Sequence, residues 1–228
     1  MKRLLLVCAA ALSITSAAAA QETPQYELFV GGSYLRVHAS GAEVTQLTGV
    51  SAIQYQPHNI NLNQLGWDTT LIENVNHWLG GEVDVSGYYG SPAASFIYPA
   101  SQLVSPSPNF SKTVPVATRY LNVMFGPRFS LRRGRVVYFA HLPVGIAHVN
   151  TSLSESAIVG SNFTNLAAGT LLAGTGVAAS PGVGMDVRIS RNVMVRPFQL
   201  DYLVTHVFGA RQDNARFSAG LNFTFGEK

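Results

Sequence analysis

The feature that most constrains the fold of this chain is a series of eight segments in which apolar and polar residues alternate. Side chains alternate between the two faces of a strand, so each segment predicts a strand with one apolar and one polar face. The connections between them run long, short, long, short, long, short and then intermediate. In an up-and-down meander, the long loops therefore share one end of the sheet and the tight turns share the other. The segments span residues 26–36, 66–73, 79–89, 116–131, 135–148, 178–190, 194–206 and 214–225.

The last segment shows the alternation most clearly. Phe217, Leu221 and Phe225 fall on one face, whereas Arg216 and Asn222 fall on the other. A strand of this kind can turn its apolar face toward lipid and its polar face toward the inside of a barrel.

Composition supports a membrane-embedded barrel. Charged residues make up 12% of the chain, about half of the roughly 25% that is usual in soluble domains. No stretch after residue 20 reaches the 18 or so consecutive apolar residues that a membrane-spanning helix needs. The sequence therefore predicts an all-β fold, an eight-stranded antiparallel up-and-down transmembrane β-barrel with short periplasmic turns and long extracellular loops.

Residues 1–20 have the pattern of a removable export signal. Lys2 and Arg3 form the basic start, an apolar stretch follows, and small residues end at Ala20. We therefore expect a signal peptide at 1–20 and one barrel domain at 21–228. Cleavage removes the only cysteine, Cys8, and leaves 13 basic and 12 acidic residues. A nearly neutral mature chain does not have the charge of a nucleic-acid-binding protein.

A soluble β-sandwich or lipocalin-like barrel also has alternating strands and is the main alternative. Its exposed faces would be rich in charge, whereas the polar faces here are rich in Gly, Ser and Asn. Aromatic residues also gather near the predicted strand ends, as in the girdles of membrane barrels. These observations favour the outer membrane of a Gram-negative cell as the location of the chain. The aromatic residues near strand ends are Tyr26, Trp67, Trp78, Tyr88, Tyr89, Tyr120, Tyr138, Phe208 and Phe225.

Prolines interrupt several of the predicted strands. A proline lacks the backbone N–H that a strand donates to its neighbour, so we expect local bulges or strand ends at these positions. Pro143 is the hardest to accommodate, because it lies in the middle of its segment. The prolines concerned are Pro127, Pro143, Pro181 and Pro197.

Several runs in the second half of the chain resemble small outer-membrane β-barrel proteins related to the transmembrane domain of outer membrane protein A. These runs are FGPRFSLRRGRV (125–136), YFAHLPVGIAH (138–148), GMDVRISRNVMVRPFQLDYL (184–203) and FSAGLNFTFG (217–226). The resemblance implies an eight-stranded barrel that the outer-membrane assembly machinery inserts. It also implies that an aromatic residue in the last strand, here Phe225, serves in recognition by that machinery.

Alternation predicts that a set of charged and polar residues points into the barrel. An eight-stranded barrel is just wide enough for side chains to fill it, and buried charges must be paired. We therefore interpret the set as a structural plug, and expect no open channel. A proton or ion path, acid–base catalysis and a small porin are the alternatives. The predicted interior residues are Glu27, Glu82, Asp84, Arg128, His141, Asp186, Arg188 and Asp201.

Catalytic, cofactor and metal motifs are weak in this sequence. The six histidines have no metal-ligand spacing, so we expect neither metal nor cofactor. His38 and Ser40 stand two residues apart where the first strand leaves the membrane. Outer-membrane lipid A deacylases use a His, a Ser and a Glu on the barrel exterior, but no outward carboxylate is evident beside this pair. A lipid A-modifying enzyme is therefore the alternative to a non-enzymatic protein.

We expect the long loops to carry the function, as loops on a rigid scaffold often do. Residues 38–65, 90–115 and 149–177 are rich in small polar residues and have few charges. The sequence favours an envelope-structural or surface-interaction role without enzymatic activity. The expected partners are outer-membrane lipid and lipopolysaccharide, the assembly machinery during insertion, and an extracellular surface or protein ligand, with no nucleic acid.

Overall fold

A computed structural model of the chain describes residues 23–39, 54–55, 60–91, 93–98, 110–153, 157–159, 164–166 and 169–227. The predicted signal peptide lies outside these residues. The strands are β1 (Pro24–Ala39), β2 (Gln54–Tyr55), β3 (Ile60–Asn74), β4 (Leu79–Gly90), β5 (Ala93–Tyr98), β6 (Phe110–Arg133), β7 (Val136–His141), β8 (Val144–Leu153), β9 (Ala157–Val159), β10 (Thr164–Leu166), β11 (Gly169–Ala179), β12 (Gly182–Arg188), β13 (Val193–Val207) and β14 (Ala210–Glu227).

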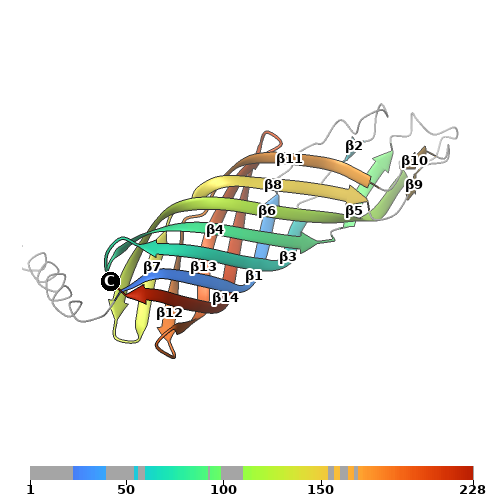
Figure 1. Cartoon of the computed structure of the whole chain (residues 1–228). Helices are drawn as coiled ribbons and strands as arrows, with labels where there is room; N and C mark the ends of the chain where they lie inside the picture. Colours follow the sequence, from blue (N-terminus) through green and yellow to red (C-terminus); the bar gives the residue numbers. More distant parts are fainter. Residues whose placement is uncertain are drawn as a thin grey trace, which may run out of the picture.

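The long strands form a closed antiparallel barrel (Figure 1). β7 and β8 together form one barrel strand, and so do β11 and β12, so the ring has the eight strands that the alternation predicts. β1 pairs with both β3 and β14, which joins the two ends of the sheet. Closure leaves no open edge as far as the turn between β13 and β14, beyond which β11 continues paired with β8 alone. A strand structure needs such closure in a lipid environment.

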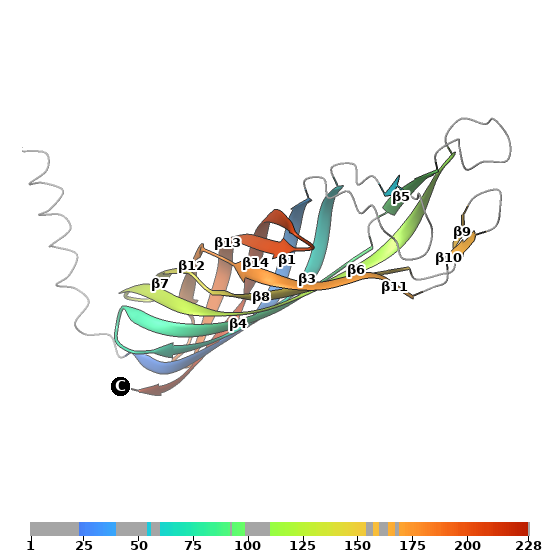
Figure 2. The same ribbon diagram turned by 90° about the horizontal axis from the view of Figure 1, so that it is seen from above.

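The two ends of the barrel differ. Short turns join β3 to β4, β6 to β7 and β12 to β13, and the C-terminus lies at the same end (Figure 1). At the opposite end, β5, β9 and β10 lie beyond the barrel wall (Figures 1 and 2). In membrane barrels the short turns are periplasmic, so β5, β9 and β10 belong to the extracellular side.

The burial pattern is the reverse of that of a soluble protein. Arg128, Arg196 and Arg216 are among the largest fully buried side chains, whereas Phe125 and Leu200 are 65% and 52% exposed. The apolar side chains therefore face outward, toward lipid, and the charged side chains fill the interior. This arrangement excludes the soluble barrel and confirms a membrane-spanning barrel of the outer-membrane type. The described residues contain no helix long and apolar enough to span a membrane.

The structure accounts for most of the prolines. Pro143 and Pro181 lie in the breaks that separate β7 from β8 and β11 from β12, as expected. Their carbonyl groups still accept hydrogen bonds from the amides of Ser180 and Tyr202, both at 2.9 Å, so the wall stays closed. Pro197 lies at a register shift between β13 and β14.

The expected bulge at Pro127 is wrong. The register of β4 with β6 runs through this residue without a shift. The carbonyl oxygen of Pro127 accepts a hydrogen bond from the amide of Leu142, at 3.1 Å, across the break between β7 and β8. The N and the O of a strand residue point to the same side. The missing N–H of Pro127 therefore faces a break that is already present in the neighbouring strand.

Several strands are longer than the apolar alternation indicates. β1 ends at Ala39, β3 begins at Ile60 and β6 begins at Phe110, so each extends into a predicted loop. In the extension of β3, the exposed polar residue Asn63 replaces an outward apolar residue, although the backbone pairing continues. The last connection is also tighter than predicted. β13 and β14 are joined by Phe208 and Gly209, with φ of 59° and 73°, as in a two-residue hairpin turn.

Candidate functional site

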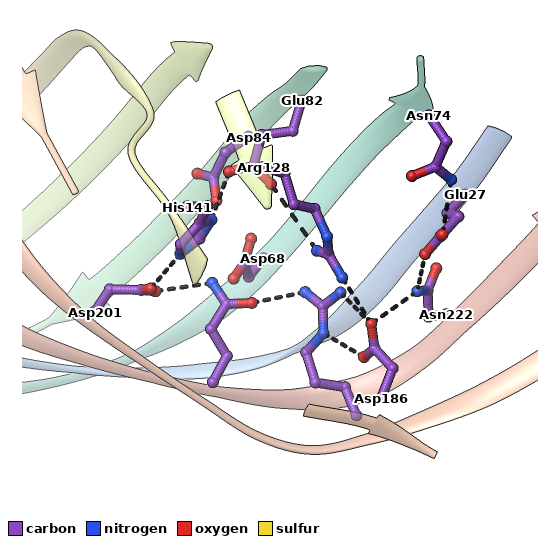
Figure 3. A network of polar contacts seen from close by, with 12 residues as sticks. Glu27, Asp68, Asn74, Glu82, Asp84, Arg128, His141, Asp186, Asp201 and Asn222 are labelled. Atoms are coloured by element: carbon purple, nitrogen blue, oxygen red, sulfur yellow. Dashed lines mark hydrogen bonds and ion pairs between the residues drawn. The ribbon is translucent and has the colours of Figure 1, made fainter. Parts of the chain in front are cut away.

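The interior of the barrel is the main polar site of the molecule, and it begins near the periplasmic end at Glu27 (Figure 3). This buried carboxylate accepts hydrogen bonds from Arg132 and Asn74, each 2.8 Å from Oε1. Its Oε2 accepts one from Asn222, also at 2.8 Å. β1, β3, β6 and β14 each supply one member, so the contacts join strands across the lumen.

Asp186 of β12 forms the next part of the network (Figure 3). Arg128 donates to its Oδ2 at 2.8 Å, and Arg196 donates to both of its oxygens, at 2.8 and 3.1 Å. The two guanidinium groups also lie over aromatic rings, Arg128 at 3.7 Å from the Phe139 centroid and Arg196 at 3.9 Å from the Phe29 centroid. Arginine is suited to this position, because its planar group can bind a carboxylate and stack on a ring at once.

His141 connects two carboxylates from different sides of the barrel. Its Nδ1 lies 2.5 Å from Glu82, and its Nε2 lies 2.6 Å from Asp201. Gly182 of β12 pairs with both His141 and Asp201 and stands between them. Its lack of a side chain provides the space in which the imidazole reaches the carboxylate.

Arg216 of β14 is the cation at the centre of the barrel. It donates to Asp201 at 2.6 Å and binds Asp84 through two parallel hydrogen bonds of 2.9 Å each. The Asp68 carboxylate lies 4.0 Å away. Because Arg216 is fully buried, these carboxylates depend on it for compensation of their charge.

The outer half of the interior combines an apolar cluster with buried uncharged polar residues such as Gln64 and Asn214. Leu35, Tyr88, Met124 and Leu203 belong to one buried cluster that begins where the ionic network ends. The cluster consists of Leu35, Val37, Tyr88, Tyr120, Met124, Ala147, Val149, Ala178, Leu203 and Val207. Along the barrel axis, the ionic network is thus followed by a layer of mainly apolar, uncharged side chains.

A barrel filled in this way should conduct poorly. We expect the purified protein to form no steady pore in a planar lipid bilayer, because the charged pairs and the apolar cluster both obstruct water and ions. Single-channel recording checks this. A stable, wild-type conductance in the nanosiemens range would contradict the filled interior and favour the small porin.

The structure places the predicted interior residues as follows. Glu27, Glu82, Asp84, Arg128, His141, Asp186 and Asp201 are all buried inside the barrel and lie in one network. Arg188 is only half-buried, at the periplasmic end of β12, and does not join the network. In the described part of the chain, no side-chain contact of Arg188 supports the prediction that it belongs to the network.

Sequence reasoning missed several members of this network. Asp68 lies in the short predicted segment 66–73, and Arg132 lies one residue beyond the predicted segment 116–131. Arg196 precedes the register shift at Pro197, so strict alternation back from Phe198 assigns it to the wrong face. Arg216, Gln199 and Asn222 stand on predicted polar faces, and this was the signal that could have identified them.

The exterior shows one further arrangement. Among the described residues, no group of three or more His, Asp or Glu side chains could hold a metal ion. His38 lies near the extracellular end of β1 and pairs with Asp213 of β14 in the strand register. Ser40 lies outside the described residues. Asp213 also forms an exposed ion pair with Arg211, at 2.9 Å.

Solved outer-membrane barrels have a similar fold. OprG from Pseudomonas aeruginosa matches with a TM-score of 0.51 and 8% identity, over 90% of this chain and 98% of that one. Neisserial surface protein A matches with a TM-score of 0.49 and 9% identity, over 90% and 99%. Ail of Yersinia pestis, solved with the heparin analogue sucrose octasulfate, matches with a TM-score of 0.47 and 14% identity, over 87% of this chain and 99% of that one. No protein family matches the sequence, and no curated protein is significantly similar.

Proposed function

Starting from an outer-membrane β-barrel, we propose that this chain is a non-enzymatic surface protein that acts through the β-structure on its extracellular side. Buried charged and apolar side chains project into the interior of the barrel, which argues against a substrate site there. The proposal therefore concerns the β-structure beyond the extracellular end of the barrel wall.

The length of β6 carries this proposal. β6 has 24 residues, whereas crossing a membrane takes a tilted strand of about 9–11. Its first residues pair with β5, and β5 pairs with β2, so a small sheet stands on the extension of the barrel wall. This sheet therefore stands beyond the membrane-spanning part of the wall, on the side where a ligand outside the cell would meet it.

Deletion of residues 91–114 tests the proposal without disturbing the barrel. Gly90 pairs with Thr118, so the deletion leaves 115–117 as a three-residue hairpin connection. We expect the variant to insert normally but to lose adherence of expressing cells to glass, polystyrene and immobilised lipopolysaccharide. Heat-modifiable gel migration reports insertion, and cell counts report adherence.

A second deletion provides the control. Residues 157–166 contain the separate β9–β10 hairpin, which makes no strand pair with the barrel among the described residues. Adherence retained without 91–114, or lost only without 157–166, would contradict a role for the β5–β6 ribbon.

A lipid A-modifying activity is the second candidate, and one observation favours it. In the backbone register of β1 with β14, His38 stands opposite Asp213, which comes from the far end of the chain. A histidine and an acidic residue are two of the three residue types that activate a serine in hydrolases. Mass spectrometry of lipid A separates the candidates. A change in acyl-chain number that depends on the protein, and that fails with His38→Ala, would reject the non-enzymatic proposal.

A further inference from the structure

Three arginines gather at one corner of the periplasmic rim. Arg133 and Arg135 flank the turn between β6 and β7, and Arg188 ends β12 beside them. The backbone amide of Arg188 donates to the carbonyl oxygen of Arg135 at 2.7 Å, so the corner is one connected structure. We call Arg133, Arg135 and Arg188 the rim arginines.

The rim arginines have no acidic partner in the part of the chain that the structure describes. Two interior carboxylates already have arginine partners, Glu27 with Arg132 and Asp186 with Arg128 and Arg196. Two guanidinium nitrogens of Arg188, Nε and Nη2, are buried without a hydrogen-bond partner. Buried donors normally have an acceptor, so these two nitrogens leave hydrogen-bonding capacity at the corner.

The position of the corner indicates which anion it would meet. On the outer surface of β6, the exposed apolar residues Phe129 and Leu131 lead directly to the exposed Arg133. Trp78 stacks on Phe129, with ring centroids 6.1 Å apart. Such an aromatic residue marks the membrane interface. An arginine two positions further along the same face lies at the height of the lipid headgroups.

We propose that the rim arginines bind the phosphate group of an anionic phospholipid in the periplasmic leaflet. Guanidinium groups bind phosphate oxygens through paired hydrogen bonds, and the uncompensated charge of the corner favours a lipid with net negative charge. Carboxylates of the cell wall are another anion on this side of the membrane. The continuity with the lipid-facing apolar surface favours the phospholipid.

Lipid retention measures this binding directly. The full-length protein is purified from mixed micelles that contain equal amounts of phosphatidylglycerol and phosphatidylethanolamine, and retained lipid is counted by native mass spectrometry. We expect the wild type to retain phosphatidylglycerol preferentially. Each arginine near an anionic surface contributes roughly fivefold to the binding constant, so Arg133→Gln with Arg135→Gln should reduce the preference by about tenfold or more. The corresponding double Lys variant should keep part of it, because the charge remains.

A matched pair at the other end of the barrel controls for charge alone. Arg36→Gln with Arg119→Gln removes two exposed arginines from the outer half of the wall and should leave the preference unchanged. Heat-modifiable gel migration verifies that every variant is folded. The proposal is overturned if the wild type shows no preference, if the rim variant keeps it, or if the control variant loses it equally. It is also overturned if the rim variant loses binding to purified cell-wall sacculi while its phosphatidylglycerol preference is unchanged.

Discussion

Replacement of Arg216 by Met should destabilise the barrel by about 3–5 kcal/mol, because removing one partner leaves buried charges uncompensated. Arg216 is fully buried and contacts Asp84 and Asp201 at hydrogen-bonding distance, with Asp68 at 4.0 Å. These carboxylates cannot reach water when the guanidinium is removed. Urea unfolding of the protein in lipid vesicles, followed by tryptophan fluorescence and gel migration, measures the change.

Two controls separate this effect from a general sensitivity to arginine substitution. Arg211 forms an exposed ion pair with Asp213, whose side chains are 61% and 41% exposed. Replacing it by Gln should have no measurable effect, because exposed pairs contribute little. Adding Asp84→Asn to Arg216→Met should recover part of the lost stability, since it removes one uncompensated charge. If Arg216→Met is no worse than Arg211→Gln, the interior network does not stabilise the barrel as the contacts indicate.

Replacement of Gly182 by Ala is the second substitution with a large expected effect. A methyl group at this position would overlap the carboxylate of Asp201 and the imidazole of His141, which are bonded to one another at 2.6 Å. Both are fixed by further contacts, His141 to Glu82 and Asp201 to Arg216, so neither can move without breaking a bond. The loss of a charged hydrogen bond and the added crowding should lower the free energy of unfolding by about 2–3 kcal/mol.

Gly32 provides the matched glycine for this test. It lies on β1 at an exposed position, and a methyl group there would meet no atom within 4 Å. Gly32→Ala should therefore unfold at the same urea concentration as the wild type. Equal midpoints for Gly182→Ala and Gly32→Ala would show that the bond between His141 and Asp201 does not contribute to stability.

The sequence by itself determined the fold, because a barrel wall is a local pattern repeated eight times. The alternation within each strand identifies its lipid-facing and inward-facing residues. In β14, for example, exposed Phe217 and Leu221 alternate with buried Arg216 and Asn222. The side of each loop follows from the order of short and long connections. No long-range contact has to be known for either conclusion.

The strand ends could not be determined in this way. The apolar alternation reports contact with lipid, and it stops where the strand leaves the membrane, although backbone pairing continues. β6 is the strongest example, since it begins at Phe110 instead of near residue 116. The local structure at the prolines could not be determined from the sequence either. Pro127 fits within β6 because the neighbouring strand is broken beside it, and that break is not visible in the sequence around Pro127.

Only the tertiary structure decided which polar residues meet inside the barrel. A polar face says that a residue points inward, but pairing across the lumen depends on the tilt and stagger of strands far apart in the sequence. Arg196 shows the limit most clearly, because a single register shift at Pro197 reverses the face that alternation assigns to it. His38 and Asp213 show the same limit on the exterior, where closure of the first strand on the last brings together residues from opposite ends of the chain.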